Sequence, residues 1–129
     1  MGTDVRITVL GGFDVVVDGR RVPAAEWRRR QAAALVKMLA LAPGRSLHRE
    51  RVIDALWPDV DVDDAAPRLH KAAHYARRSL GEAGSVVLGG ETVALFPDAR
   101  VEVDAQEFQR LAEAAVAAAD PRAAGHAAD

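Results

Sequence analysis

The sequence contains no cysteine among its 129 residues, which excludes disulfide bonds and thiolate chemistry and suits a reducing compartment. Its most apolar stretch, QAAALVKMLALAP, is too short to cross a bilayer and contains Lys37. The first residues, MGTDVRITVL, lack the basic and apolar regions of a signal peptide. We therefore expect a cytoplasmic protein without a membrane partner.

The sequence also lacks the residue patterns that carry catalysis or hold a metal. No Ser/His/Asp set has the context of a nucleophile elbow, and LGGE lacks the Lys of a phosphate-binding loop. His70 and His74 have metal-ligand spacing, but Lys71 stands where a zinc-protease motif has its Glu and would repel a metal cation. DVDVDD lacks the Gly and the terminal Glu of a calcium loop. We expect no enzyme, no metal and no cofactor.

Charge is distributed unevenly along the chain. The formal net charge is −2, but residues 1–80 hold 14 Lys or Arg against 10 acids, whereas residues 81–129 hold 3 against 9. The segment RLHKAAHYARRSLG, residues 68–81, has four Lys or Arg, two His and no acid. Solvated helix faces usually mix both signs. The first part of the chain is therefore a candidate for binding nucleic acid.

Residue patterns predict a mixed order of strands and helices. RITVL and FDVVV, followed by a turn at Asp18-Gly19, predict a small antiparallel sheet over residues 5–23. SVVLGGETVALFP predicts a hairpin that turns at Gly89-Gly90, and SL at residues 46–47 is a short strand candidate. Helices are expected over residues 28–42, 49–57, 65–80 and 104–119. The apolar face of the first helix is expected to be Ala32, Leu35, Leu39 and Ala42, and that of the second is expected to be Val52, Ile53, Leu56 and Trp57.

The expected helix over residues 65–80 has two different faces. Asp63 or Asp64 is expected to cap it, with Pro67 in its first turn and Gly81 at its end. Its apolar face consists of Leu69, Ala73, Ala76 and Leu80, with Ala72 at the edge. Its other stripe consists of Arg68, Lys71, Tyr75 and Arg78, flanked by His70, His74 and Arg77.

Such a helix fits the major groove, which is about 12 Å wide in B-DNA. Arg and Lys donate to guanine, Tyr and His reach phosphates or base edges, and Arg77 and Arg78 suit phosphates. The alternative interpretation is an ordinary solvated helix face. A second basic cluster, WRRRQ, begins at Trp27 and opposes the dipole of the first helix, so Arg28 is a candidate phosphate contact; a solvated helix start is the alternative there.

Several stretches together resemble a known family. VRITVLGGFDVVVDGRRVP, RRRQAAALVKMLALAPGRSLHRERVIDALWPD and RLHKAAHYARRSLG resemble the OmpR-type winged helix-turn-helix, most closely the branch of the SARP antibiotic-regulatory proteins. RERVIDALWPD and YARRSLG are the most specific pieces. VEVDAQEFQRLAEAA resembles the start of the bacterial transcriptional activation domain, a helical TPR-like array. The resemblance covers about residues 4–119.

The resemblance implies an α+β fold: an N-terminal antiparallel sheet, three helices and a C-terminal β-hairpin wing, plus one extra C-terminal helix. Residues 1–99 would form the winged helix-turn-helix DNA-binding domain. Residues 100–129 would form the first helix of a truncated TPR-like activation domain. Phe108 and Leu111 of that helix would pack back on the first domain, meet another copy or stay exposed, while Asp104 and Glu107 are expected to form a capping box.

The family implies sequence-specific binding of double-stranded DNA for transcriptional control. Copies would sit head-to-tail on direct repeats, and some members contact RNA polymerase. By position, Arg68, Lys71 and Tyr75 fall where base-facing residues lie, with His74, Arg77 and Arg78 nearby. Ala76 stands where the family often has Leu, which predicts looser packing.

The wing and the acidic end of the chain depart from a simple DNA-binding pattern. LGGETV has no Lys or Arg and carries Glu91, so we expect only a weak contact through Thr92 or backbone N–H groups. A second function from another class is therefore a protein-interaction module that docks polymerase or another regulator and has little DNA affinity.

Overall fold

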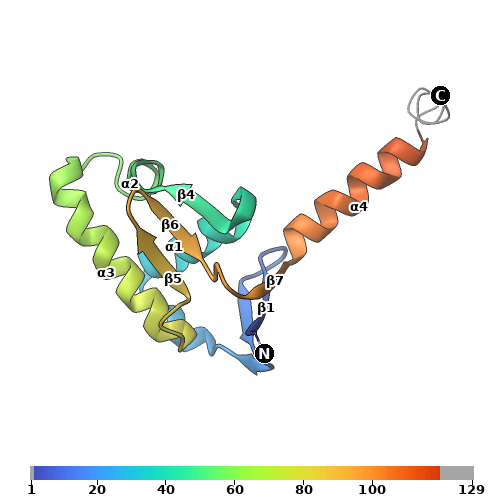
Figure 1. The fold of residues 1–129 in the computed structure, drawn as a ribbon, viewed down its shortest axis with the longest axis horizontal. Helices are drawn as coiled ribbons and strands as arrows, with labels where there is room; N and C mark the ends of the chain where they lie inside the picture. The colour runs from blue at the N-terminus through green and yellow to red at the C-terminus, as the bar shows by residue number, and fades with distance from the viewer. Residues whose placement is uncertain (1, 120–129) are drawn as a thin grey trace.

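Two small sheets and four α-helices make up the computed structural model of the chain, which describes residues 2–119 (Figure 1). The fold is therefore of the α+β class, as the sequence predicts. Among these residues, no helix is both long enough and apolar enough to span a membrane.

The first sheet differs from the expected antiparallel one. Its strands are β1 (Asp4–Thr8), β2 (Asp14–Val17), β3 (Arg20–Arg21) and β7 (Arg100–Val103), in the order β3-β2-β1-β7. The turn at Asp18-Gly19 is confirmed, and both residues have positive φ. However, β7 runs parallel to β1, with Val5 opposite Val101, so the sheet is mixed.

The strand β7 lies beyond residue 99, where the sequence analysis ends the first domain. Because it pairs with β1, the expected second segment, residues 100–129, begins inside the first sheet. Residues 120–129 of that segment lie outside the described residues. The strand that precedes the last helix thus pairs with the first strand of the chain.

The three central helices pack against one another. They are α1 (Arg30–Leu41), α2 (Arg49–Leu56) and α3 (Val62–Leu80), with short 3-10 turns at Ala24–Trp27 and Pro43–Arg45. The helix α1 packs against both α2 and α3. The predicted apolar faces are confirmed at the fully buried residues Leu35, Leu39, Val52, Ile53, Leu69, Ala73, Ala76 and Leu80.

The helix α3 begins three residues earlier than predicted. Its N-cap is Asp61, and the backbone N–H of Ala65 already donates to the Asp61 carbonyl at 2.8 Å. The expected cap at Asp63 or Asp64 is therefore wrong, and both acids lie in the first turn, where they favour the positive end of the helix dipole. Pro67 is the sixth helical residue, in the second turn and not in the expected first turn, so it has no N–H to donate to the Asp63 carbonyl.

The C-terminal end of α3 matches the prediction. Gly81 has φ of 73°, a left-handed conformation that favours glycine. The guanidinium of Arg20 donates to the Leu80 carbonyl at 3.1 Å, and a Cβ at Gly81 would lie 2.9 Å from that guanidinium. Glycine is thus favoured here by conformation, while the Arg20 guanidinium, at the end of a flexible side chain, could move to make room for a Cβ.

The second sheet contains the predicted hairpin. Its strands are β4 (Ser46–His48), β5 (Val86–Gly89) and β6 (Thr92–Leu95), in the order β4-β6-β5. The turn falls at Gly90-Glu91, one residue later than expected, because Gly89 pairs with Thr92. Arg45 donates from its guanidinium to the carbonyls of Leu95 and Phe96 and so fixes the end of β6.

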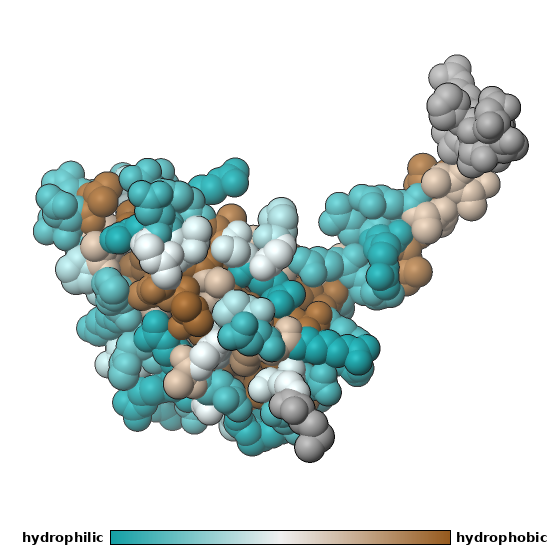
Figure 2. All heavy atoms as spheres, viewed as in Figure 1, coloured by the Kyte–Doolittle hydropathy of each residue, from teal (hydrophilic) through white to brown (hydrophobic). Residues whose placement is uncertain are grey.

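The last helix, α4 (Asp104–Ala119), extends away from the rest of the molecule (Figure 1). None of its residues is buried, and Phe108, Leu111 and Val116 are 60–69% exposed. Phe108 and Leu111 thus do not pack back on the rest of the chain and are exposed in the single chain, and apolar residues of α4 are visible in Figure 2.

The expected capping box at the start of α4 is not formed as predicted. The Asp104 carboxylate accepts hydrogen bonds from the backbone N–H groups of Val9 and Leu10, at 2.8 and 3.1 Å. Glu107 instead pairs with Arg110. Asp104 thus joins the first turn of α4 to the loop after β1, and nothing in a local sequence pattern indicates that link.

Candidate nucleic-acid interface

The exposed face of α3 carries only cationic and potentially cationic groups between residues 68 and 78. Arg68, Lys71, His74 and Arg78 are exposed, and so is His70. The opposite face is held in the core by Leu69 and by small alanines. Because the helix is anchored by that face, the charged side chains are presented in a fixed order along one surface.

Two of the predicted contact residues have intramolecular partners. The Arg77 Nε donates to the Val86 carbonyl at 2.7 Å, which ties α3 to β5. Tyr75 is half-buried, and the guanidinium carbon of Arg29 lies 3.5 Å from the centroid of its ring. Arg77 and Tyr75 therefore hold the local structure, and their predicted contact with DNA stays a prediction.

The structure brings the start of α1 beside α3. Arg29 and Arg30, together with Arg68 and Lys71, line a hollow of about 280 Å³ whose other walls include Trp57 and Tyr75. The N-cap of α1 is Arg29, and its first turn has neither an acid nor a side-chain cap. Positive side chains therefore surround a helix end that is itself positive, which strengthens attraction for an anion.

The combined surface of α3 and the start of α1 is named the cationic face below. It consists of Arg28, Arg29, Arg30, Arg68, Lys71 and Arg78. Within residues 2–119, none of these six side chains forms an ion pair, whereas Arg6, Arg21, Arg100 and Arg110 all do. Six exposed cations without an ion pair in the described residues, four of them around one hollow, favour a polyanionic partner.

Sequence reasoning missed Arg29 and Arg30 as members of this face, although it included Arg28. The signal was present in the RRR run, but a sequence pattern does not show which residues of a helix start face another helix.

His74 is exposed on α3 and stacks edge-on against Tyr75, with ring centroids 5.3 Å apart.

The hairpin of β5 and β6 offers little to an anion. The Thr92 hydroxyl donates to the Gly89 carbonyl at 3.2 Å, so this side chain is already engaged. Glu91 lies 3.4 Å from His48, and its carbonyl accepts from the Arg49 backbone at 2.8 Å. The tip is thus held by β4 and the start of α2, and only its backbone and the exposed Thr92 surface remain available.

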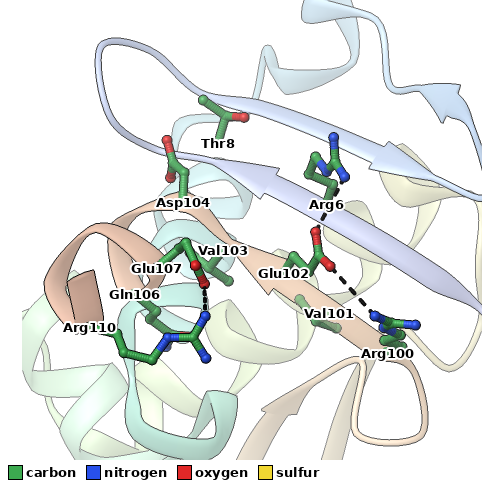
Figure 3. A pocket seen from close by; sticks show the side chains of 10 residues that line it. All are labelled: Arg6, Thr8, Arg100, Val101, Glu102, Val103, Asp104, Gln106, Glu107 and Arg110. Carbon is green, nitrogen blue, oxygen red and sulfur yellow. Dashed lines mark hydrogen bonds and ion pairs between the residues drawn. The ribbon is translucent and has the colours of Figure 1, made fainter. Parts of the chain in front are cut away.

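A larger hollow lies elsewhere, between β7 and the start of α4 (Figure 3). It measures about 770 Å³. Figure 3 shows Glu102 between Arg6 and Arg100, and Glu107 paired with Arg110. Because its charged groups neutralise one another, this hollow is a weaker candidate for an ionic ligand than the cationic face.

Other chemistries find no support in the described part of the chain. Residues 2–119 contain no group of three or more His, Asp or Glu side chains placed to hold a metal ion. The sequence matches no protein-family model and no curated protein. The case for function therefore depends on the geometry and charge of the cationic face.

Proposed function

We propose that the chain is a sequence-specific, double-stranded DNA-binding transcriptional regulator that acts in the bacterial cytoplasm. The observation that carries the proposal is the cationic face, where six side chains without an ion pair in residues 2–119 line α3 and the start of α1. The DNA backbone, with one negative charge per about 1.7 Å of axis, is the partner whose charge density matches it.

The arrangement of the elements supports a winged helix-turn-helix of the OmpR type, in the SARP branch. The helix α2 packs against α3, the two are joined by residues 57–61, and the β5–β6 hairpin follows α3 directly. In this proposal α3 is the recognition helix, the hairpin is the wing, and α4 is the first helix of a transcriptional activation domain.

The residues of the cationic face take different roles. Arg68 and Lys71 occupy the exposed middle of α3 and contact base edges in the major groove. Arg78 lies nearer the end of α3 and contacts a phosphate, as do Arg28 and Arg30 beside the start of α1. The wing contributes only backbone N–H groups and the neighbourhood of Thr92, because it has no cation.

A second candidate function is protein interaction. Its support is the exposed apolar side of α4, where Phe108, Leu111 and Val116 face solvent. Exposed patches of this kind often mark interaction sites. RNA polymerase or another regulator is the partner class that fits a transcription factor. This candidate does not account for the cationic face, so we rank it second.

Charge reversal distinguishes the two candidates. Lys71→Glu with Arg78→Glu is expected to weaken binding to duplex DNA on the order of a hundredfold, because two phosphate or base contacts become repulsive. The matched control is Arg6→Glu with Arg21→Glu, which makes the same change of net charge on the outer face of the first sheet. Equal loss in both variants, with both folded by circular dichroism, would contradict a specific role for α3.

A further inference from the structure

A second cationic hollow lies along α1; it shares Arg30 with the cationic face, but no residue of α3 lines it. It measures about 430 Å³ and is named the Trp27 groove. The rings of Phe13 and Trp27 form one wall, edge-on to each other with centroids 5.0 Å apart. Ala33 and Ala34 form its small-residue floor.

The rim of the Trp27 groove is positive. Arg30 and Lys37 line it, and no acidic side chain does. They lie seven residues apart on α1, about 10 Å along the helix axis. The Lys37 ammonium is 5.0 Å from the centroid of Phe13, and neither cation has an ion-pair partner within residues 2–119.

Trp27 itself lacks a hydrogen-bond partner. Its Nε1 is buried, and no acceptor reaches it among the described residues. An orphaned N–H is unfavourable, so the indole gains from any rearrangement that brings it an acceptor. An occupant of the groove that supplies a carbonyl or carboxylate oxygen would relieve it.

The same chain carries a segment with the complementary pattern. Residues 59–64, DVDVDD, comprise the end of the link between α2 and α3 and the first three residues of α3, and they are named the acidic segment. All four aspartates are exposed, and Val62 is 52% exposed between two of them. Within the described part of the chain, none of these carboxylates lies within ion-pair distance of a cation.

The two surfaces match in charge and in spacing. The acidic segment places an exposed valine between carboxylates, and the Trp27 groove places an apolar floor between cations. Asp59 and Asp63 are four residues apart and span at most about 13 Å, which is comparable to the separation of Arg30 and Lys37. Both surfaces are free in one molecule, and they belong to different elements.

We propose that the Trp27 groove binds the acidic segment of a second copy of this chain. Val62 lies over Ala34, Asp59 and Asp63 pair with Arg30 and Lys37, and the Trp27 indole gains an acceptor. The contact is heterologous, because each chain gives its groove to one neighbour and its acidic segment to another. It therefore builds a head-to-tail row, and it forms without DNA.

Sedimentation velocity of the chain over about 10 µM to 1 mM, at low salt, tests the contact, since a small interface of this kind is weak. We expect the sedimentation coefficient to rise with concentration and to return to the monomer value at high salt. A monomer at every concentration would overturn the proposal. So would an association that survives high salt.

Two neutral variants assign the surfaces. The groove variant is Ala34→Gln with Lys37→Gln, and the segment variant is Asp59→Asn with Asp63→Asn, which leaves the N-cap residue Asp61 unchanged. We expect each alone to associate at least tenfold more weakly than the unchanged chain. In a mixture of the two, the segment variant keeps its groove and the groove variant keeps its acidic segment. One contact can then form between them, so a 1:1 dimer that cannot extend into a row should appear.

Further controls separate this contact from the DNA proposal and from α4. Lys71→Gln with Arg78→Gln should leave association unchanged even if it abolishes DNA binding. Association that persists in the groove and segment variants, but is lost in Phe108→Ser with Leu111→Ser, would overturn the proposal by assigning the contact to α4. In amide spectra, the indole N–H signal of Trp27 should shift with concentration, and that of Trp57 should not; Trp27→Phe assigns the two signals.

Discussion

The guanidinium carbon of Arg29 lies 3.5 Å from the ring centroid of Tyr75, which joins the start of α1 to the middle of α3. This contact sets two segments of the cationic face at a fixed separation. A planar guanidinium over a tyrosine ring combines charge attraction with close packing. The face is therefore held in shape before any partner arrives.

The first prediction concerns this stacking. Arg29→Lys keeps the charge but loses the planar group, so the free energy of unfolding should fall by about 0.5–1 kcal/mol. Urea denaturation measures this, and DNA affinity should fall only a few-fold. Arg29→Gln, which loses the charge as well, should lose more affinity. Equal affinities for the two variants would show that the charge of Arg29 does not contribute to binding.

The neighbouring arginines of α3 provide the second prediction. Arg77 is half-buried and donates to the Val86 carbonyl, so Arg77→Ala should destabilise the fold by about 1–2 kcal/mol. Arg78 is exposed and has no such bond, so Arg78→Ala should change stability by less than about 0.5 kcal/mol and instead weaken DNA binding. Thermal melts and anisotropy titrations of both variants check this difference between a stabilising Arg77 and a DNA-binding Arg78. Equal losses of stability and of DNA affinity in the two variants would contradict it.

The third prediction concerns pH. Burial raises the pKa of Asp104, but the backbone N–H groups of Val9 and Leu10 that donate to its carboxylate outweigh burial, so its pKa lies below the ordinary value of 3.8. A lowered pKa gives stability that is complete above the unfolded value and is lost as pH falls through the folded value. Part of the acid sensitivity below about pH 4 should therefore belong to Asp104.

Asp104→Asn tests this assignment, because a neutral amide keeps the shape and loses the charge. The variant should be less stable than the unchanged chain at neutral pH, and the gap should narrow as the pH falls below about 4. Urea denaturation at several pH values measures the gap. A gap that stays constant with pH would mean that the ionised carboxylate is not the stabilising species.

The fourth prediction concerns the acids at the start of α3. Asp63 and Asp64 favour the helix dipole, worth about 0.3–1 kcal/mol each, but they also repel phosphates near the cationic face. Asp63→Asn with Asp64→Asn should therefore lower stability while strengthening DNA binding several-fold at low salt. Affinity that falls together with stability would contradict the proposed position of α3 on DNA.

Local patterns predicted much of this fold. The alternation of valines, the Asp18-Gly19 turn and the helical spacing of Leu35 and Leu39 each depend on neighbours in sequence, and each is confirmed. The core face of α3 is also confirmed, because a 3.6-residue period identifies the buried side wherever the helix packs.

Non-local contacts account for what the sequence did not predict. The strand β7 was not predicted, because its partner β1 is almost the whole chain away in sequence and no turn connects the two strands. Asp104 fits the pattern of a helix cap, yet its carboxylate oxygens accept hydrogen bonds from backbone N–H groups of a loop that is distant in sequence. Arg77 and Arg78 are equivalent in sequence, and only the packing of β5 distinguishes the anchor from the exposed cation.

The salt dependence of duplex-DNA binding tests the central claim most directly. For the three phosphate contacts assigned to Arg28, Arg30 and Arg78, log affinity should fall linearly with log salt at a slope of about −3. Lys71→Gln with Arg78→Gln should reduce the magnitude of that slope by about 1, because Arg78 contacts a phosphate and Lys71 contacts base edges. Absence of binding at low salt, or a slope that these substitutions leave unchanged, would contradict a DNA-binding role for the cationic face.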